Sequence, residues 1–381
     1  MKSVFIVGST GSLGKEALEV VHNLGDDYKV VGITGFSNGN LLLEQASFNR
    51  VKYVGASEAI AQKIKFDLSD TYVFDVEKEL TSVLGDASPD ITLFLSSEIT
   101  ALPAIIELLS EKKRVAIANK ESIIAGGDVI FNESSRKYIL PVDSEASAIF
   151  QILLGEPFES IERLIITASG GPFLDYDESS ISSVNAAMAL KHPNWRMGRK
   201  ITIDSATMVN KAFEVMEAHF LFGLPYTKIS PIVHRESVVH SIVEFVDGFE
   251  KAILSVPKMY YSLQYALTYP SRVKSNFPKL RLEELGKLSF ESLDVNKFKA
   301  FSTVLKFGTE GGNFLPIIVA VDEVLATQFI EGNIGYNDIN NYFEEIMETF
   351  EHKDIHSYEE IKYFFDQGIS QTERILRRHN I

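Results

Sequence analysis

A glycine-rich turn near the start of the chain, Gly8–Gly14, limits the possible folds most strongly. It follows Val4–Val7, a short apolar run that predicts a buried strand. The residues after it share one helical face: Ala17, Leu18, Val20, Val21 and Leu24. A strand, a glycine turn and a helix in this order bring backbone N–H groups and a helix N-terminus toward a pyrophosphate. The pattern predicts a dinucleotide site, and the alternative is an ordinary tight turn.

The end of the second predicted strand, Lys29–Gly35, bears on the choice of dinucleotide. An acid usually stands there to bind the ribose hydroxyls of NAD, but this chain reads Gly35-Phe36-Ser37-Asn38. No Lys or Arg stands there either. These residues therefore weaken an NAD assignment without supplying a clear determinant for the 2′-phosphate of NADP.

Further apolar runs alternate with helical segments over the first 145 or so residues and predict an α/β fold with a Rossmann-like parallel sheet. These runs are Tyr72–Phe74, Ile91–Leu95, Arg114–Ala118 and Ile139–Val142. Leu164–Ala168 and Ile201–Ile203 begin a central α+β region, predicted as a catalytic domain over 146–270. A linker is predicted over 271–294 and a C-terminal helical bundle over 295–381, where Ser357 and Glu360 form a capping-box pattern.

Composition narrows the class of protein. The 381 residues carry 37 Lys+Arg against 52 Asp+Glu, a formal net charge of −15, which disfavours a nucleic-acid or anionic-membrane binder. No uncharged run is long enough for a transmembrane helix. Cysteine is absent, so a metal must bind oxygen or imidazole ligands, and a reducing cytoplasm is the expected location.

Three carboxylates form a candidate metal site. Asp143 and Glu145 follow the strand Ile139–Val142, and a spacing of two in extended chain places both on one side. Glu214 lies in a predicted helix, Ser205–Phe222. Carboxylates from two segments would suit a hard divalent ion such as Mg²⁺ or Mn²⁺. The alternative is solvated surface acids or a helix cap, since acids are common in a chain this acidic.

Two segments could bind a phosphate. Ser169-Gly170-Gly171-Pro172 ends a predicted strand and offers hydroxyl and backbone donors, although an ordinary turn explains it as well. Ser205, Asn210 and Lys211 could complete a phosphate site, or they could be polar residues of an amphipathic helix. The only Trp, Trp195, lies in the basic segment Lys191–Lys200, which suits either a lid over a ligand or a buried ring.

These motifs together closely resemble the 1-deoxy-D-xylulose 5-phosphate reductoisomerase family over almost the whole chain. The most specific segments are Gly8–Gly14, Ala118–Ser122, Pro141–Glu145, Ser169–Phe173, His192–Trp195 and Asp204–Lys211. The resemblance implies an enzyme of non-mevalonate isoprenoid biosynthesis that makes 2-C-methyl-D-erythritol 4-phosphate. It also implies NADPH, a divalent metal (Mg²⁺, Mn²⁺ or Co²⁺) and a homodimer.

The resemblance also implies roles for individual residues. The metal ligands would be Asp143, Glu145 and Glu214, and the phosphate would be held by Ser169, Ser205, Asn210 and Lys211. The sugar would contact Lys120, Ser144, Glu145, His192 and Trp195, and catalysis would fall to Lys120, His192 and the three metal ligands. The cofactor would contact Gly8, Thr10, Gly11, Ser12, Leu13, Gly35, Ser37, Asn38, Asn119, Glu121, Met197 and Gly198.

The implied chemistry is a retro-aldol/aldol rearrangement followed by hydride transfer, with metal-assisted stabilisation of the developing negative charge. The anionic substrate requires a local basic pocket in an acidic protein. The residues expected to form it are Lys120, Lys211, His192, Arg196, Arg199 and Lys200. Ser37 departs from the Lys or Arg common in the family, so the preference for NADPH over NADH is expected to be smaller than in relatives.

Two rival interpretations remain open at this point. The first is an NAD(P)-dependent dehydrogenase of a small hydroxy acid, which needs neither the metal nor the phosphate site. The second is a diverged, non-catalytic paralogue that only binds the cofactor. Metal-dependent turnover would separate the first from a reductoisomerase, and the presence of Asp143, Glu145, Glu214 and Lys211 argues against the second.

Overall fold

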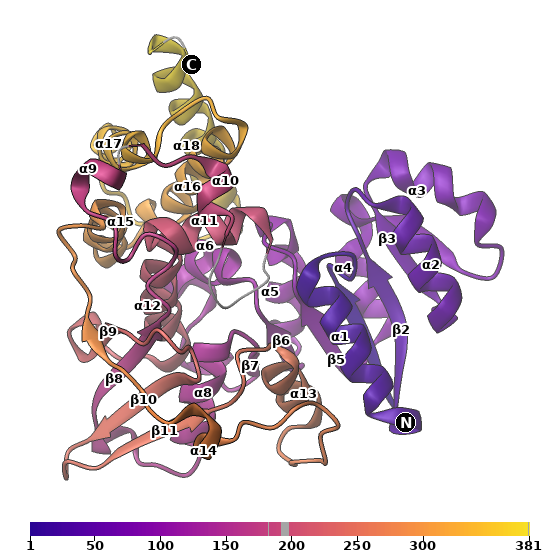
Figure 1. The fold of residues 1–381 in the computed structure, drawn as a ribbon. Coiled ribbons are helices and arrows are strands. Elements are labelled where there is room, and N and C mark those ends of the chain that lie inside the picture. Colours follow the sequence, from indigo (N-terminus) through magenta and orange to yellow (C-terminus); the bar gives the residue numbers. More distant parts are fainter. Residues whose placement is uncertain (182, 192–197, 380) are drawn as a thin grey trace. The chain divides into compact units, whose positions relative to one another are not determined.

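The computed structural model describes residues 1–181, 183–191, 198–379 and 381 (Figure 1). The chain forms two compact units. The first contains Met1–Ser122, Ser134–Ser147 and Lys258–Pro278, and the second contains Ile123–Glu133, Ala148–Pro257 and Lys279–Ile381. The functional domain limits expected from the sequence remain a prediction.

The first unit is built on a parallel sheet, as predicted, but the sheet has seven strands, one more than the sequence indicated, in the order β4-β3-β2-β1-β5-β6-β7. Its strands are β1 (Lys2–Val7), β2 (Tyr28–Thr34), β3 (Tyr53–Ala56), β4 (Tyr72–Asp75), β5 (Ile91–Phe94), β6 (Val115–Ile117) and β7 (Ile139–Pro141). Its helices are α1 (Ser12–Asn23), α2 (Gly39–Asn49), α3 (Glu58–Ile64), α4 (Val76–Ala87), α5 (Leu102–Ser110) and α13 (Tyr260–Thr268). The strand order reverses between β1 and β5, and ligands of such sheets bind beyond the carboxyl ends of the strands at this point.

The second unit contains a five-stranded mixed sheet with the order β11-β10-β8-β9-β12. Its strands are β8 (Ile161–Ala168), β9 (Ile229–Val233), β10 (Val239–Phe245), β11 (Glu250–Leu254) and β12 (Glu291–Ser292). Strands β8 and β9 are parallel and the other pairs are antiparallel. One face of the sheet is covered by an apolar core in which Leu164 and Ile166 of β8 meet Val215 and Ala218 of a helix.

That helix is α12 (Val209–Phe222), which follows α11 (Arg199–Thr207). The prediction of one helix over Ser205–Phe222 is therefore wrong, because Met208 adopts a left-handed conformation (φ 62°) between the two. The apolar run Ile201–Ile203 lies inside α11. The break turns α12 away from α11 while keeping the two helices in contact.

The C-terminal region is helical, as predicted, and Figure 1 shows its helices gathered near α11 and α12. They are α15 (Lys299–Glu310), α16 (Phe314–Glu331), α17 (Tyr336–Met347) and α18 (Tyr358–Arg378). Helix α16 is buried over most of its length, and Ser357 caps α18 by accepting a hydrogen bond from Glu360 N, as predicted. The remaining helices are α6 (Lys120–Ile130), α7 (Glu133–Arg136), α8 (Ser144–Leu153), α9 (Glu178–Ile181), α10 (Ala186–Ala189) and α14 (Leu282–Leu285).

A search of the described residues finds no helix with the length and apolar character needed to cross a bilayer.

Candidate active site

The three glycines of the turn after β1 are glycine for different structural reasons. A Cβ at Gly14 would lie 2.2 Å from the Gly8 carbonyl oxygen, and Gly8 itself has φ +96°. Gly11, the N-cap of α1, has an ordinary φ of −69°. A Cβ there would lie 3.6 Å from Gly8 O, an ordinary contact. Folding therefore explains Gly8 and Gly14, whereas the bare backbone at Gly11 fits close approach of a ligand to the helix N-terminus.

Two residues that the sequence did not single out hold this turn. Ser9 N donates to Thr34 O at 2.7 Å, and Gly8 N donates to the Thr34 hydroxyl at 3.0 Å. The Ser9 hydroxyl donates to Gln45 Oε1 at 2.7 Å, and Gln45 Nε2 returns a bond to Ser9 O at 3.0 Å. Both partners are buried. No local pattern marks Gln45, because its partner lies 36 residues earlier.

The end of β2 lies beside the glycine turn. A Cβ at Gly35 would come within 2.6 Å of the Thr10 side chain, so this position requires glycine. Ser37 and Asn38 follow and are exposed. Asn38 caps α2, since its Oδ1 accepts a hydrogen bond from Leu41 N at 3.1 Å. Its amide nitrogen and the Ser37 hydroxyl are then the side-chain donors that this edge can offer to a ligand.

The segment after β6 is buried and polar. Asn119 is 1% exposed, donates to Glu98 O at 2.8 Å and accepts from Ser122 N at 2.7 Å, so it fixes the start of α6. Lys120 lies 2.6 Å from Asp143 Oδ2, with side chains only 5% and 14% exposed. Glu121 is also buried, in the first turn of α6. A buried cation therefore faces one of the predicted metal ligands within the first unit.

The chain containing Asp143 and Glu145 is not extended, contrary to the sequence prediction. Strand β7 ends at Pro141, and α8 begins at Ser144. Asp143 caps this helix: its Oδ1 accepts from Ser144 N at 3.0 Å, and its carbonyl oxygen accepts from Ser147 N at 2.8 Å. Glu145 lies in the first helical turn, where its Oε2 accepts from the Ser144 hydroxyl at 2.5 Å. Both acids are half-buried beside a helix N-terminus, which favours negative charge.

Ser169 and Ser205 belong to neighbouring segments of the second unit. Ser169 follows β8, and its hydroxyl accepts from Gly171 N at 3.3 Å. A Cβ at Gly171 would lie 2.6 Å from Ser205 O, so the turn packs directly on the backbone of α11. Ser205 is 9% exposed. Gly198 caps the start of the same helix. The structure thus brings the two predicted phosphate segments together.

The first two turns of α12 carry the other polar residues of this region. Lys211 and Glu214 form an ion pair, and Asn210 Nδ2 donates to Glu214 Oε1. Lys211 Nζ also donates to the Thr167 carbonyl oxygen of β8 at 2.5 Å. Lys211 and Glu214 are each 4% exposed. The helical spacing of three and four predicted this shared face correctly.

Lys200, one of the residues expected in the basic pocket, forms ion pairs with Asp204 and with Asp322 of α16. Its charge therefore also serves the contact between α11 and α16, and its place in the pocket stays a prediction. Burial raises the pKa of Asp322, and Lys200 opposes that shift. The predictions for His192, Trp195, Arg196 and Met197 lie outside the described residues.

Comparison with known protein families shows to which family the chain belongs. A model of the 1-deoxy-D-xylulose 5-phosphate reductoisomerase family matches residues 4–127, and models of its C-terminal domains match residues 139–222 and 254–368. The enzyme of that name from Caldanaerobacter subterraneus is 38% identical over 383 aligned residues, with 100% of both chains covered. The chain belongs to the 1-deoxy-D-xylulose 5-phosphate reductoisomerase family.

Other members of the reductoisomerase family agree in sequence and fold. The 1-deoxy-D-xylulose 5-phosphate reductoisomerase 1 of Bacillus cereus is 41% identical, with 92% of both chains covered. A crystal structure of DOX-P reductoisomerase in complex with NADPH, fosmidomycin and magnesium has a TM-score of 0.92 at 29% identity, covering 99% of this chain and 98% of that one. The Zymomonas mobilis reductoisomerase in complex with NADPH has a TM-score of 0.88 at 29% identity, covering 98% of this chain and 99% of that one.

Proposed function

We propose that this chain converts 1-deoxy-D-xylulose 5-phosphate to 2-C-methyl-D-erythritol 4-phosphate with NADPH and a divalent metal, as a step of non-mevalonate isoprenoid biosynthesis. The observation that carries the proposal is the polar group on α12: Lys211 and Glu214 are each 4% exposed and ion-paired, and the partly buried Asn210 donates to Glu214 from the same face. Burying charges is costly, so such a group is typical of a functional site.

Substrate phosphate binding is assigned to Ser169, Ser205, Asn210 and Lys211. The supporting geometry is the packing of Gly171 on Ser205 O and the position of Lys211 against the end of β8. Lys211 supplies positive charge, and the hydroxyl and amide groups supply directional donors. Because the phosphate is remote from the reacting carbons, its binding energy can hold the sugar in register during rearrangement.

Metal binding is assigned to Asp143 and Glu145 of the first unit and Glu214 of the second. The donor set fits Mg²⁺ or Mn²⁺, with Co²⁺ as a further candidate, because it consists of carboxylates and no cysteine. When bound, such an ion polarises the substrate's ketone and adjacent hydroxyl oxygens. Lys120 Nζ lies 2.6 Å from Asp143 Oδ2, so a positive charge stands beside this proposed ligand.

Lys120 and Ser144 are assigned to the sugar, together with His192 and Trp195. Lys120 is held beside Asp143 in a buried setting, so its ammonium can orient the substrate's oxygens with little competition from water. The Ser144 hydroxyl bonds Glu145 and can reorient toward substrate when that carboxylate binds metal. Catalysis is assigned to Lys120, His192, Asp143, Glu145 and Glu214.

Cofactor binding is assigned to the turn after β1 and the edges around it. The assigned residues are Gly8, Thr10, Gly11, Ser12, Leu13, Gly35, Ser37, Asn38, Asn119, Glu121, Met197 and Gly198. The bare backbone of Gly11 at the N-terminus of α1 supports pyrophosphate binding. The absence of an acid over Gly35–Asn38 supports NADPH over NADH.

A homodimer in the cytoplasm is the proposed state. Strand β11 is an edge of the five-stranded sheet, and the exposed apolar residues Val246 and Phe249 lie just before it, which supports association there. The rival functions, a hydroxy-acid dehydrogenase or a non-catalytic paralogue, gain no support from the family matches.

The proposed function is tested by NADPH oxidation with 1-deoxy-D-xylulose 5-phosphate, with and without Mg²⁺ or Mn²⁺. Substrate-dependent and metal-dependent oxidation with formation of 2-C-methyl-D-erythritol 4-phosphate supports it. Absence of turnover with metal, or turnover of a small hydroxy acid in its place, contradicts it.

A further inference from the structure

The loop Ser169–Asp177 after β8 needs to be held in place, because two of its residues provide little stiffness. Gly170 and Gly171 both have positive φ, +87° and +67°. Glycines at such positions adopt many backbone conformations in an unrestrained chain. The loop carries Ser169, a proposed phosphate ligand, so its conformation sets where that hydroxyl lies.

The middle of the loop is fixed by aromatic packing. Phe173 is 1% exposed and packs edge-to-face on Tyr336, with ring centroids 5.4 Å apart. The Tyr336 hydroxyl donates to Ala206 O at 2.8 Å, next to Ser205. This arrangement ties the middle of the loop to α11. Phe173 also contacts Tyr176 further along the loop, with ring centroids 5.2 Å apart, and Tyr176 N donates to Phe173 O at 3.1 Å.

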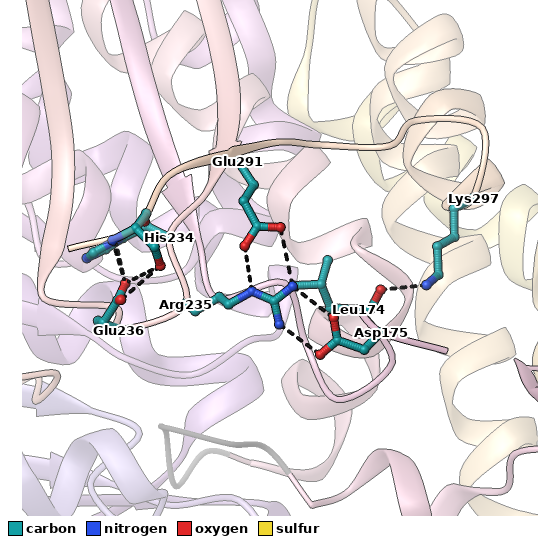
Figure 2. A network of polar contacts seen from close by, with 8 residues as sticks. Leu174, Asp175, His234, Arg235, Glu236, Glu291 and Lys297 are labelled. Atoms are coloured by element: carbon teal, nitrogen blue, oxygen red, sulfur yellow. Dashed lines mark hydrogen bonds and ion pairs between the residues drawn. The ribbon is translucent and has the colours of Figure 1, made fainter. Parts of the chain in front are cut away.

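Arg235, which follows the neighbouring strand β9, holds the loop through Asp175. Ala168 of β8 pairs with Val233 of β9, and His234 N donates to Ala168 O at 2.7 Å. Arg235 therefore leaves the sheet close to where the loop begins. Its Nη1 and Nη2 donate to the two carboxylate oxygens of Asp175, each at 2.8 Å (Figure 2).

The other side of the same guanidinium binds Glu291 of β12. Nε donates to Glu291 Oε1 at 2.7 Å, and Nη2 donates to Oε2 at 3.3 Å. Hydrogen bonding from Arg235 lowers the pKa of both Asp175 and Glu291 below their usual values. One planar cation thus joins two carboxylates from segments far apart in the sequence, with the bidentate geometry that makes such contacts directional.

Lys297 and His234 make further contacts in this region. Lys297 donates to Leu174 O at 2.6 Å (Figure 2). It also donates to Tyr176 O, on the other side of Asp175. Ser289 O, which precedes β12, lies 2.8 Å from His234 Nδ1. The loop residues around Asp175 are therefore held by Arg235, which follows β9, and by Lys297, which precedes α15, while Glu291 of β12 holds Arg235.

We propose that Arg235 is a positioning residue for the substrate phosphate: through Asp175 it holds the Ser169–Asp177 loop so that Ser169 and its glycine turn stay against Ser205. The inference rests on the proposed function of Ser169 and Ser205 as phosphate ligands. In this proposal Arg235 acts through Asp175 and is assigned no contact with the substrate.

If Arg235 contributed only to overall stability, its replacement would give a different result. The Arg235 and Asp175 side chains are 40% and 74% exposed, and exposed ion pairs contribute little to global stability. Arg163 provides a matched control, because it makes a similar bond to Glu244 in the same sheet (2.7 Å) and is 43% exposed, but it lies near the opposite end of β8. Removing either Arg should leave the folded state nearly as stable.

The test compares Arg235→Ala, Arg235→Lys, Asp175→Asn and Arg163→Ala with wild type. The dissociation constant for inorganic phosphate is measured by calorimetry, and the KM for 1-deoxy-D-xylulose 5-phosphate, the KM for NADPH and the melting temperature are measured in parallel. Arg235→Ala should raise the phosphate dissociation constant and the substrate KM by the same factor, about fivefold, with the NADPH KM unchanged. Arg235→Lys, which keeps the charge but not the fork, should recover part of the loss, and Arg163→Ala should change neither constant.

Wild-type phosphate affinity in a folded Arg235→Ala protein overturns the proposal, and so does an equal loss in Arg163→Ala. If Arg235→Ala does not fold, Asp175→Asn and Arg235→Lys decide: unchanged phosphate affinity in both overturns the proposal, and a loss in both supports it. The proposed function is tested separately, by turnover of the wild-type enzyme. If the proposed function is wrong, the unmutated enzyme will show it. If this inference is wrong, only the ratio of variant to wild-type phosphate affinity will show it.

Discussion

Lys211 and Glu214 form an ion pair one turn apart on α12, with side chains 5% and 4% exposed. The pair joins a residue assigned to the substrate phosphate to one assigned to the metal. Lys211 also reaches the Thr167 carbonyl oxygen, so the pair is anchored to β8. Binding of metal to Glu214 and of phosphate to Lys211 would therefore draw on the same buried network, in which each partner compensates the other's charge in the ligand-free chain.

Glu214→Gln should lower metal-dependent turnover by more than about a hundredfold. Mutating a residue that only hydrogen-bonds to a metal ligand already lowers metal affinity or activity by roughly 10–100-fold. Glutamine keeps the side-chain volume, so the fold should remain intact. The measurement is kcat as a function of Mg²⁺ concentration, with circular dichroism as the check on folding. Wild-type activity in this variant would remove Glu214 from the metal site.

Lys211→Ala should weaken substrate binding by roughly ten- to a hundredfold while changing NADPH binding little, because a charge-assisted contact to phosphate is lost. It also leaves Glu214 without its cation, which typically costs about 3–5 kcal/mol of stability. Dissociation constants for both ligands should therefore be compared under conditions where the variant is folded. Equal weakening of both would mean that Lys211 serves the fold or the cofactor.

Gly11→Ala and Gly14→Ala should separate binding from folding in the glycine turn. A Cβ at Gly11 meets only an ordinary contact at 3.6 Å, whereas a Cβ at Gly14 would lie 2.2 Å from Gly8 O. Gly14→Ala should therefore lower the melting temperature sharply. Gly11→Ala should keep wild-type stability yet lose roughly ten- to a hundredfold in NADPH affinity, as expected for overpacking of about 1–3 kcal/mol in the complex. Unchanged NADPH affinity in Gly11→Ala would place the pyrophosphate elsewhere.

Ser37→Arg should enlarge the preference for NADPH over NADH. Ser37 and Asn38 can offer the 2′-phosphate only neutral hydrogen bonds, which are about half as strong as charge-assisted ones. Wild type should therefore prefer NADPH modestly. The check is kcat/KM for both cofactors in wild type and variant; an NADH-preferring wild type, or no gain in the variant, would show that the 2′-phosphate does not lie at the end of β2.

The sequence predicted most of the parallel sheet because its strands are apolar runs bounded by turns. It missed β3, whose four residues include Gly55; a Cβ there would come within 2.5 Å of the Phe74 ring, so packing on the adjacent strand, not local preference, fixes this residue. The break at Met208 was also missed, because a left-handed non-glycine residue interrupts neither the apolar nor the polar pattern.

The candidate site was predicted in part for a similar reason. The face shared by Asn210, Lys211 and Glu214 follows from helical spacing alone. In contrast, Lys200 binds Asp322, 122 residues away, and Arg235 binds Asp175, 60 residues away. Such partners become neighbours only when helices and strands pack, so no local pattern in the sequence marks them.

The activity proposed for this chain is metal-dependent reduction and isomerisation of 1-deoxy-D-xylulose 5-phosphate. The most direct measurement is the rate of NADPH oxidation by the purified protein with this substrate, first after chelation and then with Mg²⁺ or Mn²⁺ restored, with the product identified by mass and NMR. We expect NADPH oxidation only when metal is present. The amount of NADPH oxidised should equal the amount of 2-C-methyl-D-erythritol 4-phosphate formed. Metal-independent oxidation, or no oxidation with substrate and metal both present, would contradict the proposed activity.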